Sequence, residues 1–134
     1  MQAANKIMMC AVNVSDMAKS KEFYAEKLGL TISTEYRQDD DNWWVTLALP
    51  EGGATLTLSR ASISPESIKP GTLAVYLETS DVEAAHKELA VKVKAEDVQN
   101  DLFGPGSGVK WFNVEDPDGT RVFFVQKHEA RAPF

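Results

Sequence analysis

One pattern occurs twice in this 134-residue sequence: a strand-like apolar run followed by a capped, amphipathic helix. The first copy is "MMCAVNVSDMAKSKEFYAEKLGL", residues 8–30, and the second is "LAVYLETSDVEAAHKEL", residues 73–89. A single module of this size leaves one face of its sheet uncovered and has only a small core. We therefore expect two tandem modules that cover one another's exposed surface.

Capping residues predict where each helix begins. Ser15 and Asp16 precede the first helix, and Gly29 marks its end. The second helix follows Ser80-x-x-Glu83, which has the form of a capping box.

Each copy is followed by further strand-like segments and a hairpin turn. The turn is "PEGG" at residues 50–53 in the first half and "DPDG" at residues 116–119 in the second. These features predict an α+β fold of two tandem βαβββ modules, forming a curled mixed sheet around a cleft with the helices on the outer face. We expect a single domain, 1–134, with module one at about 6–60, a linker at 61–70 and module two at about 71–127.

Composition excludes several classes of partner. The net charge is −6 and lysine and arginine are not clustered, which argues against nucleic acid and anionic membranes. No apolar run approaches the ~20 residues that span a bilayer. The N-terminus has no signal-peptide pattern and Cys10 is the only cysteine, so we expect a cytoplasmic protein.

Strand alternation separates a packing face from a second, mixed face. In the first strand Cys10, Val12 and Val14 are expected to face the helix, and Cys10 to be a buried, inert thiol. The opposite face is small and mixed in polarity, which suits the wall of a cleft. Its predicted members are Met9, Ala11, Asn13, Thr57, Ala74, Tyr76, Glu78, Arg121 and Phe123.

The strand-"VSD"-helix ending in "FYAEKLGL", the repeat and the terminal "DPDG" hairpin together resemble the vicinal oxygen chelate superfamily. That family includes glyoxalase I, extradiol dioxygenases, fosfomycin-modifying enzymes and drug-binding proteins of the bleomycin-resistance type. The resemblance extends over about residues 6–127 and implies the fold. It does not specify the chemistry, because fold and function separate in such families.

The metal enzymes of this family use His and Glu side chains from four strands, and the resemblance places those positions here. They fall on Met9, on Ala74 (or Thr72 if the register slips by two), on Thr57 and on Phe123. A hard divalent ion needs several oxygen or imidazole donors, and none of these residues is a His or a carboxylate. We expect neither a metal site nor another cofactor.

Other chemically capable residues have simpler interpretations. His86 flanks the apolar stripe of the second helix and His128 lies in the C-terminal tail, without ligand spacing between them. The run Asp39-Asp40-Asp41 is expected in a solvated loop, where it is also able to attract a cationic ligand to a cleft mouth. No catalytic residue is predicted.

The mixed face predicts a binding site for a small molecule, because apolar and aromatic groups with a few polar ones are the usual lining of such sites. Trp43, Trp44 and Trp111 are candidates for stacking on a planar ligand or for core and interface positions; the sequence leaves open which face of its strand Trp44 occupies. The predicted ligand-binding residues are Met9, Ala11, Asn13, Trp44, Thr57, Ala74, Tyr76, Trp111, Arg121 and Phe123.

Three functions remain open at this stage. The first is a metal-independent protein resembling the bleomycin-resistance type, which captures an aromatic or cationic small molecule in the cleft. The second is an enzyme of the glyoxalase or dioxygenase class with a non-standard metal site. The third is a non-catalytic structural or regulatory module whose cleft is filled by its own side chains. The resemblance also implies a homodimer, with residues 61–70 as the crossover between modules.

Overall fold

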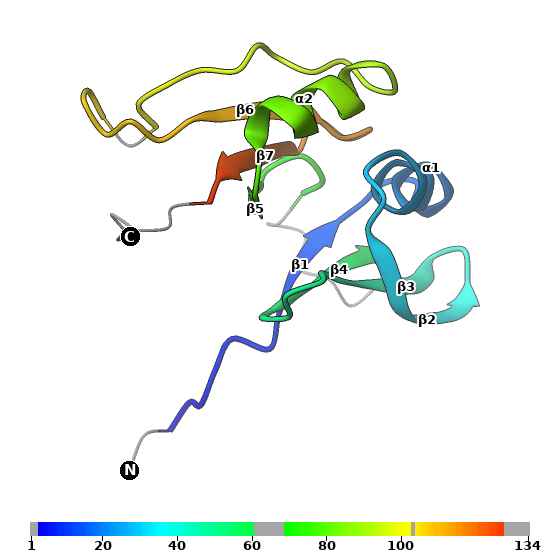
Figure 1. Cartoon of the computed structure of the whole chain (residues 1–134). Helices are drawn as coiled ribbons and strands as arrows, with labels where there is room; N and C mark the ends of the chain where they lie inside the picture. The colour runs from blue at the N-terminus through cyan, green and yellow to red at the C-terminus, as the bar shows by residue number, and fades with distance from the viewer. Residues whose placement is uncertain (1–2, 61–68, 103, 128–134) are drawn as a thin grey trace. The chain divides into compact units, whose positions relative to one another are not determined.

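The computed structural model describes residues 3–60, 69–102 and 104–127. The chain divides into two compact units, Met1–Thr72 and Leu73–Phe134, and Figure 1 traces both. Each unit is described here by itself. Most of the predicted linker, residues 61–68, lies outside the described residues.

The first unit is a βαβββ module, as the sequence predicts. Its elements are β1 (Met9–Asn13), α1 (Met17–Lys21), the π-helix η1 (Glu22–Lys27), β2 (Thr31–Asp39), β3 (Asn42–Ala48) and β4 (Thr55–Arg60). They form a mixed sheet of order β1-β4-β3-β2, in which β1 and β4 are parallel and the other pairs are antiparallel. Residues 49–54 turn the chain between β3 and β4, where the sequence predicts a hairpin.

The first helix begins where its cap predicts, but its second half is a π-helix. The Asp16 carboxylate accepts a hydrogen bond of 3.1 Å from the backbone N–H of Lys19. At the other end the N–H of Leu28 donates to the carbonyl of Phe23, five residues earlier, at 2.9 Å. The adjacent rings of Phe23 and Tyr24 are 5% and 0% exposed, so the wider turn accommodates two consecutive bulky side chains in the core.

Helix packing gives the first sheet one buried, aliphatic face. Val12, Val45 and Leu58 lie side by side across three strands, and each is at most 2% exposed. The expected burial of Cys10 on this face is wrong, because its side chain is exposed. Cys10 lies near the beginning of the edge strand β1, whereas the helix starts just beyond the opposite end of that strand.

The second unit is a shorter version of the same module. It contains β5 (Ala74–Thr79), α2 (Val82–Ala90), β6 (Trp111–Glu115) and β7 (Arg121–Gln126), with sheet order β5-β7-β6 and a parallel β5–β7 pair. The predicted additional strand is reduced to isolated bridges from Ala95 to Val114 and from Gln99 to Trp111. The segment between them contains Glu96 and Asp97, which have low strand propensity.

The second helix is capped by Asp81, so the predicted capping box at Ser80 is wrong. The Asp81 carboxylate accepts from the N–H of Ala84 at 3.1 Å. Gln126 of β7 supports the same turn: its side-chain oxygen accepts from the N–H of Val82 at 2.8 Å, and its amide donates to the carbonyl of Ser80 at 2.6 Å. A side chain distant in sequence therefore shares the capping of this helix start. Neither described α-helix has the length and hydropathy of a membrane-spanning segment.

The "DPDG" turn joins β6 to β7 as predicted. The Asp116 carboxylate accepts from the backbone N–H groups of Asp118 and Thr120, both at 2.8 Å. Gly119 has a φ of 88°, which glycine adopts without steric cost. The turn therefore holds β6 and β7 in a register that places Asn113 opposite Phe123.

Glu35 connects β2 to the first helix. Its carboxylate accepts hydrogen bonds from the Lys21 ammonium at 2.8 Å and from the Trp43 indole N–H at 2.8 Å. These two donors, Lys21 first, hold the pKa of Glu35 below its ordinary value of 4.5.

Replacing Glu35 with Gln is expected to flatten the acid dependence of stability. Because the folded-state pKa is lowered, the carboxylate stabilises the fold above about pH 4.5, and this contribution disappears as the pH falls through the folded-state value. At pH 7 the variant should lose up to about 1 kcal/mol, since the pair is partly exposed. Urea unfolding at pH 7, 4.5 and 3 measures both effects, with Glu26→Gln on η1 as the control. An equal loss in both variants would contradict the assignment.

Candidate functional site

Five of the ten predicted binding residues lie on the far face of the first sheet, meaning the face opposite α1. Cross-strand pairing aligns Ala11 with Thr57, and Asn13 with Ser59 and then Trp44. Met9 continues the same face of β1 by strand alternation. The register therefore decides what the sequence left open: Trp44 lies on the far face and Trp43 on the helix side. The far face also carries Thr34, Tyr36, Thr46 and Ser59. The sequence does not predict these residues, because their face follows only once the side of the sheet on which Trp44 lies is known.

Polar side chains on this face bond to one another. The Thr57 hydroxyl donates to the Met9 sulfur at 3.2 Å and lies 3.1 Å from the Thr46 hydroxyl. Trp44 contacts Tyr36, with ring centroids 5.6 Å apart. Tyr36 is 62% exposed, so the face presents an accessible aromatic pair.

The residues to which the resemblance assigns the family's metal ligands are poor donors for a divalent ion. In the first unit Met9 and Thr57 bond to each other, and a thioether sulfur and a hydroxyl are poor donors for a hard cation. In the second unit Ala74 and Phe123 offer no donor atom. Among the described residues, no three His, Cys, Asp or Glu side chains gather in a way that would hold an ion.

The other five predicted residues share the far face of the second sheet, opposite α2. Tyr76 of β5 lies beside Phe123 of β7, and their rings stack with centroids 4.5 Å apart and planes inclined by 12°. Trp111 of β6 lies 5.4 Å from Phe123 on the other side. We call Tyr76, Phe123 and Trp111 the aromatic row. Tyr76 is 55% exposed, so the row is accessible from solvent.

A charged end adjoins the aromatic row. Ala74, Arg121 and Glu115 lie side by side across the three strands. The Arg121 guanidinium donates to the Asn113 side-chain oxygen at 3.0 Å and forms an ion pair with Glu115 at 3.0 Å. The sequence-based prediction includes Ala74 and Arg121 but not Asn113 and Glu115, which share the face of Trp111 by strand alternation.

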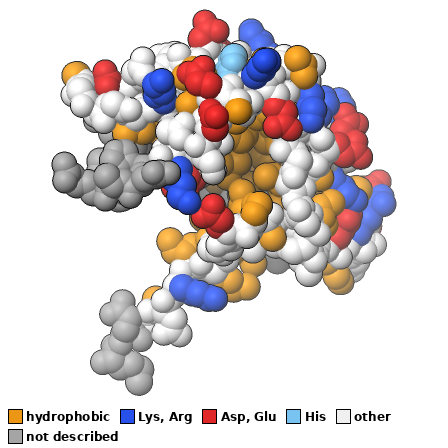
Figure 2. Space-filling model, in the orientation of Figure 1, with side chains coloured by type: hydrophobic (Ala, Val, Ile, Leu, Met, Phe, Trp, Pro, Cys, Tyr) orange, Lys and Arg blue, Asp and Glu red, His pale blue; other side chains and the backbone are white. Residues whose placement is uncertain are grey.

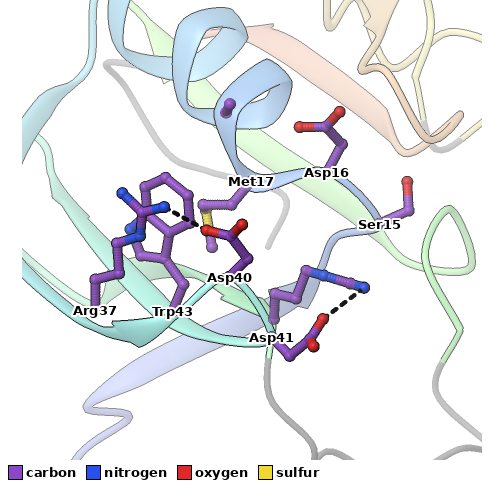
Figure 3. A pocket seen from close by; sticks show the side chains of 9 residues that line it. Ser15, Asp16, Met17, Arg37, Asp40, Asp41 and Trp43 are labelled. Carbon is purple, nitrogen blue, oxygen red and sulfur yellow. Dashed lines mark hydrogen bonds and ion pairs between the residues drawn. The ribbon is translucent and has the colours of Figure 1, made fainter.

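A groove in the first unit lies elsewhere, on the helix side of the sheet. It has a volume of about 490 Å³, and none of the ten predicted residues lines it. Figure 3 shows that Ser15, Asp16 and Met17 border it from one side and Asp40 and Asp41 from the hairpin.

Two ion pairs lie in this groove. Arg37 binds Asp40, and Arg60 contacts Asp41 at 3.2 Å. The Arg37 guanidinium also lies 4.1 Å from the centroid of the Trp43 ring. The groove's indole face is thus covered by an arginine of the same chain, and the predicted acidic loop is exposed but has basic partners.

The one histidine among the described residues, His86, does not belong to either far face. The His86 imidazole is partly buried and meets the Phe112 ring edge-on at 5.1 Å, on the helix side of the second sheet. His128 lies outside the described residues.

Figure 2 shows acidic and basic side chains side by side over the visible face.

Comparison with protein families identifies the fold. A model described as the Glyoxalase/Bleomycin resistance protein/Dioxygenase superfamily matches residues 6–124. The chain belongs to this superfamily. The resemblance to vicinal oxygen chelate proteins is therefore confirmed over nearly all of the sequence. A comparison with curated protein sequences finds no significant match.

Solved structures of this superfamily align with more than nine-tenths of the chain. TnmS3, an antibiotic binding protein from Streptomyces sp. CB03234, is 25% identical with a TM-score of 0.77, and the alignment covers 96% of this chain and 100% of TnmS3. A glyoxalase/bleomycin resistance protein from the same Streptomyces is 25% identical with a TM-score of 0.72, covering 91% and 100%. A superfamily member from Sphaerobacter thermophilus, 24% identical with a TM-score of 0.76 and coverage of 94% and 100%, shows the shared fold.

Restoring a single histidine at Met9 should not create a metal site. Met9→His supplies one imidazole, while Thr57 beside it and the positions in the second unit still lack strong donors. We expect calorimetric titration with Zn²⁺ to give the same weak response as Met8→His, the same change one residue earlier. Tight 1:1 binding by Met9→His alone would show that the ligand positions are mapped wrongly.

Proposed function

We propose that this chain captures a planar aromatic small molecule without a metal ion. The observation that carries the proposal is the aromatic row on the far face of the second sheet. An aromatic side chain that is more than half exposed usually marks a contact surface when it lies within a larger apolar group. Stacked rings give affinity to planar ligands because they bury a large area with little loss of side-chain freedom.

A basic group on the ligand also fits this surface. Glu78 pairs with Val125 on β7, and Val125 pairs with Trp111 on β6, so Glu78 lies on the same face as the aromatic row. Its exposed carboxylate is available to a cation while the aromatic part stacks. The overall charge of −6 favours approach of a positively charged compound.

The comparison with TnmS3 supports capture over catalysis. That protein is an antibiotic binding protein and aligns over its full length with this chain. Binding of this kind needs a shaped surface and no reacting group, which agrees with the poor donor set at Met9, Thr57, Ala74 and Phe123. We therefore favour stoichiometric sequestration over a glyoxalase or dioxygenase reaction and over a filled, purely structural module.

Tryptophan fluorescence offers a direct test, because the three indoles are in different places. We expect a panel of planar aromatic and cationic compounds to include ligands that change the emission. Trp43→Phe should keep that change, since Trp43 lies on the helix side, and Trp111→Phe should reduce it. Tyr76→Ala should raise the dissociation constant about five- to tenfold, because the ligand loses a stacking partner. Val91→Ala, at an exposed position directly after α2, is the control.

If no compound changes the emission, or if binding requires a divalent ion and is abolished by a chelator, the metal-free proposal is wrong.

We further propose a homodimeric, cytoplasmic protein. Exposed apolar residues support self-association: Ile7 and Met8 before β1 are 70% and 68% exposed. Light scattering during size-exclusion chromatography should give twice the 14.8 kDa chain mass, and Ile7→Asp with Met8→Asp should lower it. A wild-type mass of one chain would contradict the dimer.

A further inference from the structure

A hollow on the far face of the second sheet is not used by the stacking proposed above. It has a volume of about 250 Å³ and is lined by Lys94, Glu96, Glu115, Asp116 and Arg121. Pockets that enclose a complete drug-sized ligand have volumes of about 300–1,000 Å³. This hollow therefore has room for a substituent of a ligand rather than for the whole molecule.

Arg121 joins the hollow to the aromatic row. It precedes Phe123 by two residues on β7, so the two side chains share a face and their Cα atoms are roughly 7 Å apart along the strand. The hollow lies toward β6, whereas Ala74, the neighbour of Arg121 on β5, lies on the other side of that arginine. A ring stacked on Tyr76 and Phe123 thus lies within one substituent's length of the hollow.

Residues 94–99, which carry the isolated bridges to β6 and are called the bridge segment, supply the remaining wall. Ala95 pairs with Val114, and the N–H of Glu96 donates to the carbonyl of Asn113 at 3.0 Å. Alternation then places Lys94 and Glu96 on the side opposite Ala95, together with Glu115. The hollow lies where this segment runs beside β6 and pairs with it only at isolated bridges.

The lining carries both donors and acceptors, from two basic side chains and three carboxylates. Lys94 and Arg121 donate, and Glu96 and Glu115 accept. The Asp116 carboxylate is engaged by backbone N–H groups of its own turn. Arg121 has five N–H groups, more than its contacts with Asn113 and Glu115 use.

This balance selects among substituents. An anion would meet the carboxylates of Glu96, Glu115 and Asp116, and a cation would meet the two basic groups. A neutral group rich in hydroxyls finds a partner on each side, because every hydroxyl both donates and accepts. We propose that the ligand is an aromatic compound with a polyhydroxylated, sugar-like substituent, whose ring stacks on the aromatic row while its hydroxyls bind in the hollow. This inference rests on the proposed function and specifies its ligand class.

A matched series of probes tests the inference in the full-length protein. 4-Methylumbelliferone supplies the ring alone, its β-glucoside adds a polyol, and its phosphate adds an anion. Calorimetric titration is expected to show the glucoside binding about tenfold more tightly than the parent ring and more tightly than the phosphate. Lys94→Ala and Glu96→Ala should each reduce glucoside affinity about three- to tenfold while leaving the parent within twofold. Lys92→Ala, two residues from Lys94 and outside the hollow, should change neither.

The possible failures are distinguishable. If the ring binds but the glucoside gains nothing, or if Lys94→Ala and Glu96→Ala leave its gain intact, the hollow is not a polyol site and aromatic capture still stands. If the phosphate binds best, the balanced-lining argument is wrong and the hollow selects anions. If none of the three binds, this ligand class is overturned, and the wider fluorescence panel decides whether aromatic capture fails with it.

Discussion

In each unit a helix connects the two edges of one sheet, and this connection determines where chemistry is possible. In the first unit β1 and β2 are opposite edge strands, so the helix between them has to cross one face of the sheet. In the second, α2 leads from the edge strand β5 to the bridge segment beside β6. The crossed face is filled by aliphatic and aromatic core residues. The other face is left for polar and stacking side chains.

The two far faces differ in the side chains that they carry. The first carries hydroxyls, a thioether and the Tyr36–Trp44 pair, whereas the second carries the aromatic row and a charged end. The second face combines apolar area with directed donors and acceptors, which is the combination that gives small-molecule sites both affinity and orientation. Short distances along one strand, from Arg121 to Phe123, bring these two functions together.

The resemblance assigns the metal-ligand positions of this superfamily's enzymes to residues that are poor donors for a divalent ion. Sheet positions that would have to carry imidazole or carboxylate instead carry Met9, Thr57, Ala74 and Phe123. Phe123 is the informative case, because its ring is the centre of the aromatic row. The position that the resemblance assigns to a ligand atom in the metal enzymes is occupied here by an aromatic ring in contact with two others.

The sequence by itself determined the repeat, the module type, the turns and the alternation that puts Met9, Ala11 and Asn13 on one face, because these depend on local periodicity and turn chemistry. Tertiary structure decided the rest. Register between strands placed Trp44 on the far face and brought Asn113 and Glu115 to Arg121. Long-range contacts from Gln126 supported the second helix cap, and edge position exposed Cys10. Such features depend on which strands become neighbours, and that is a property of the whole module rather than of any local pattern.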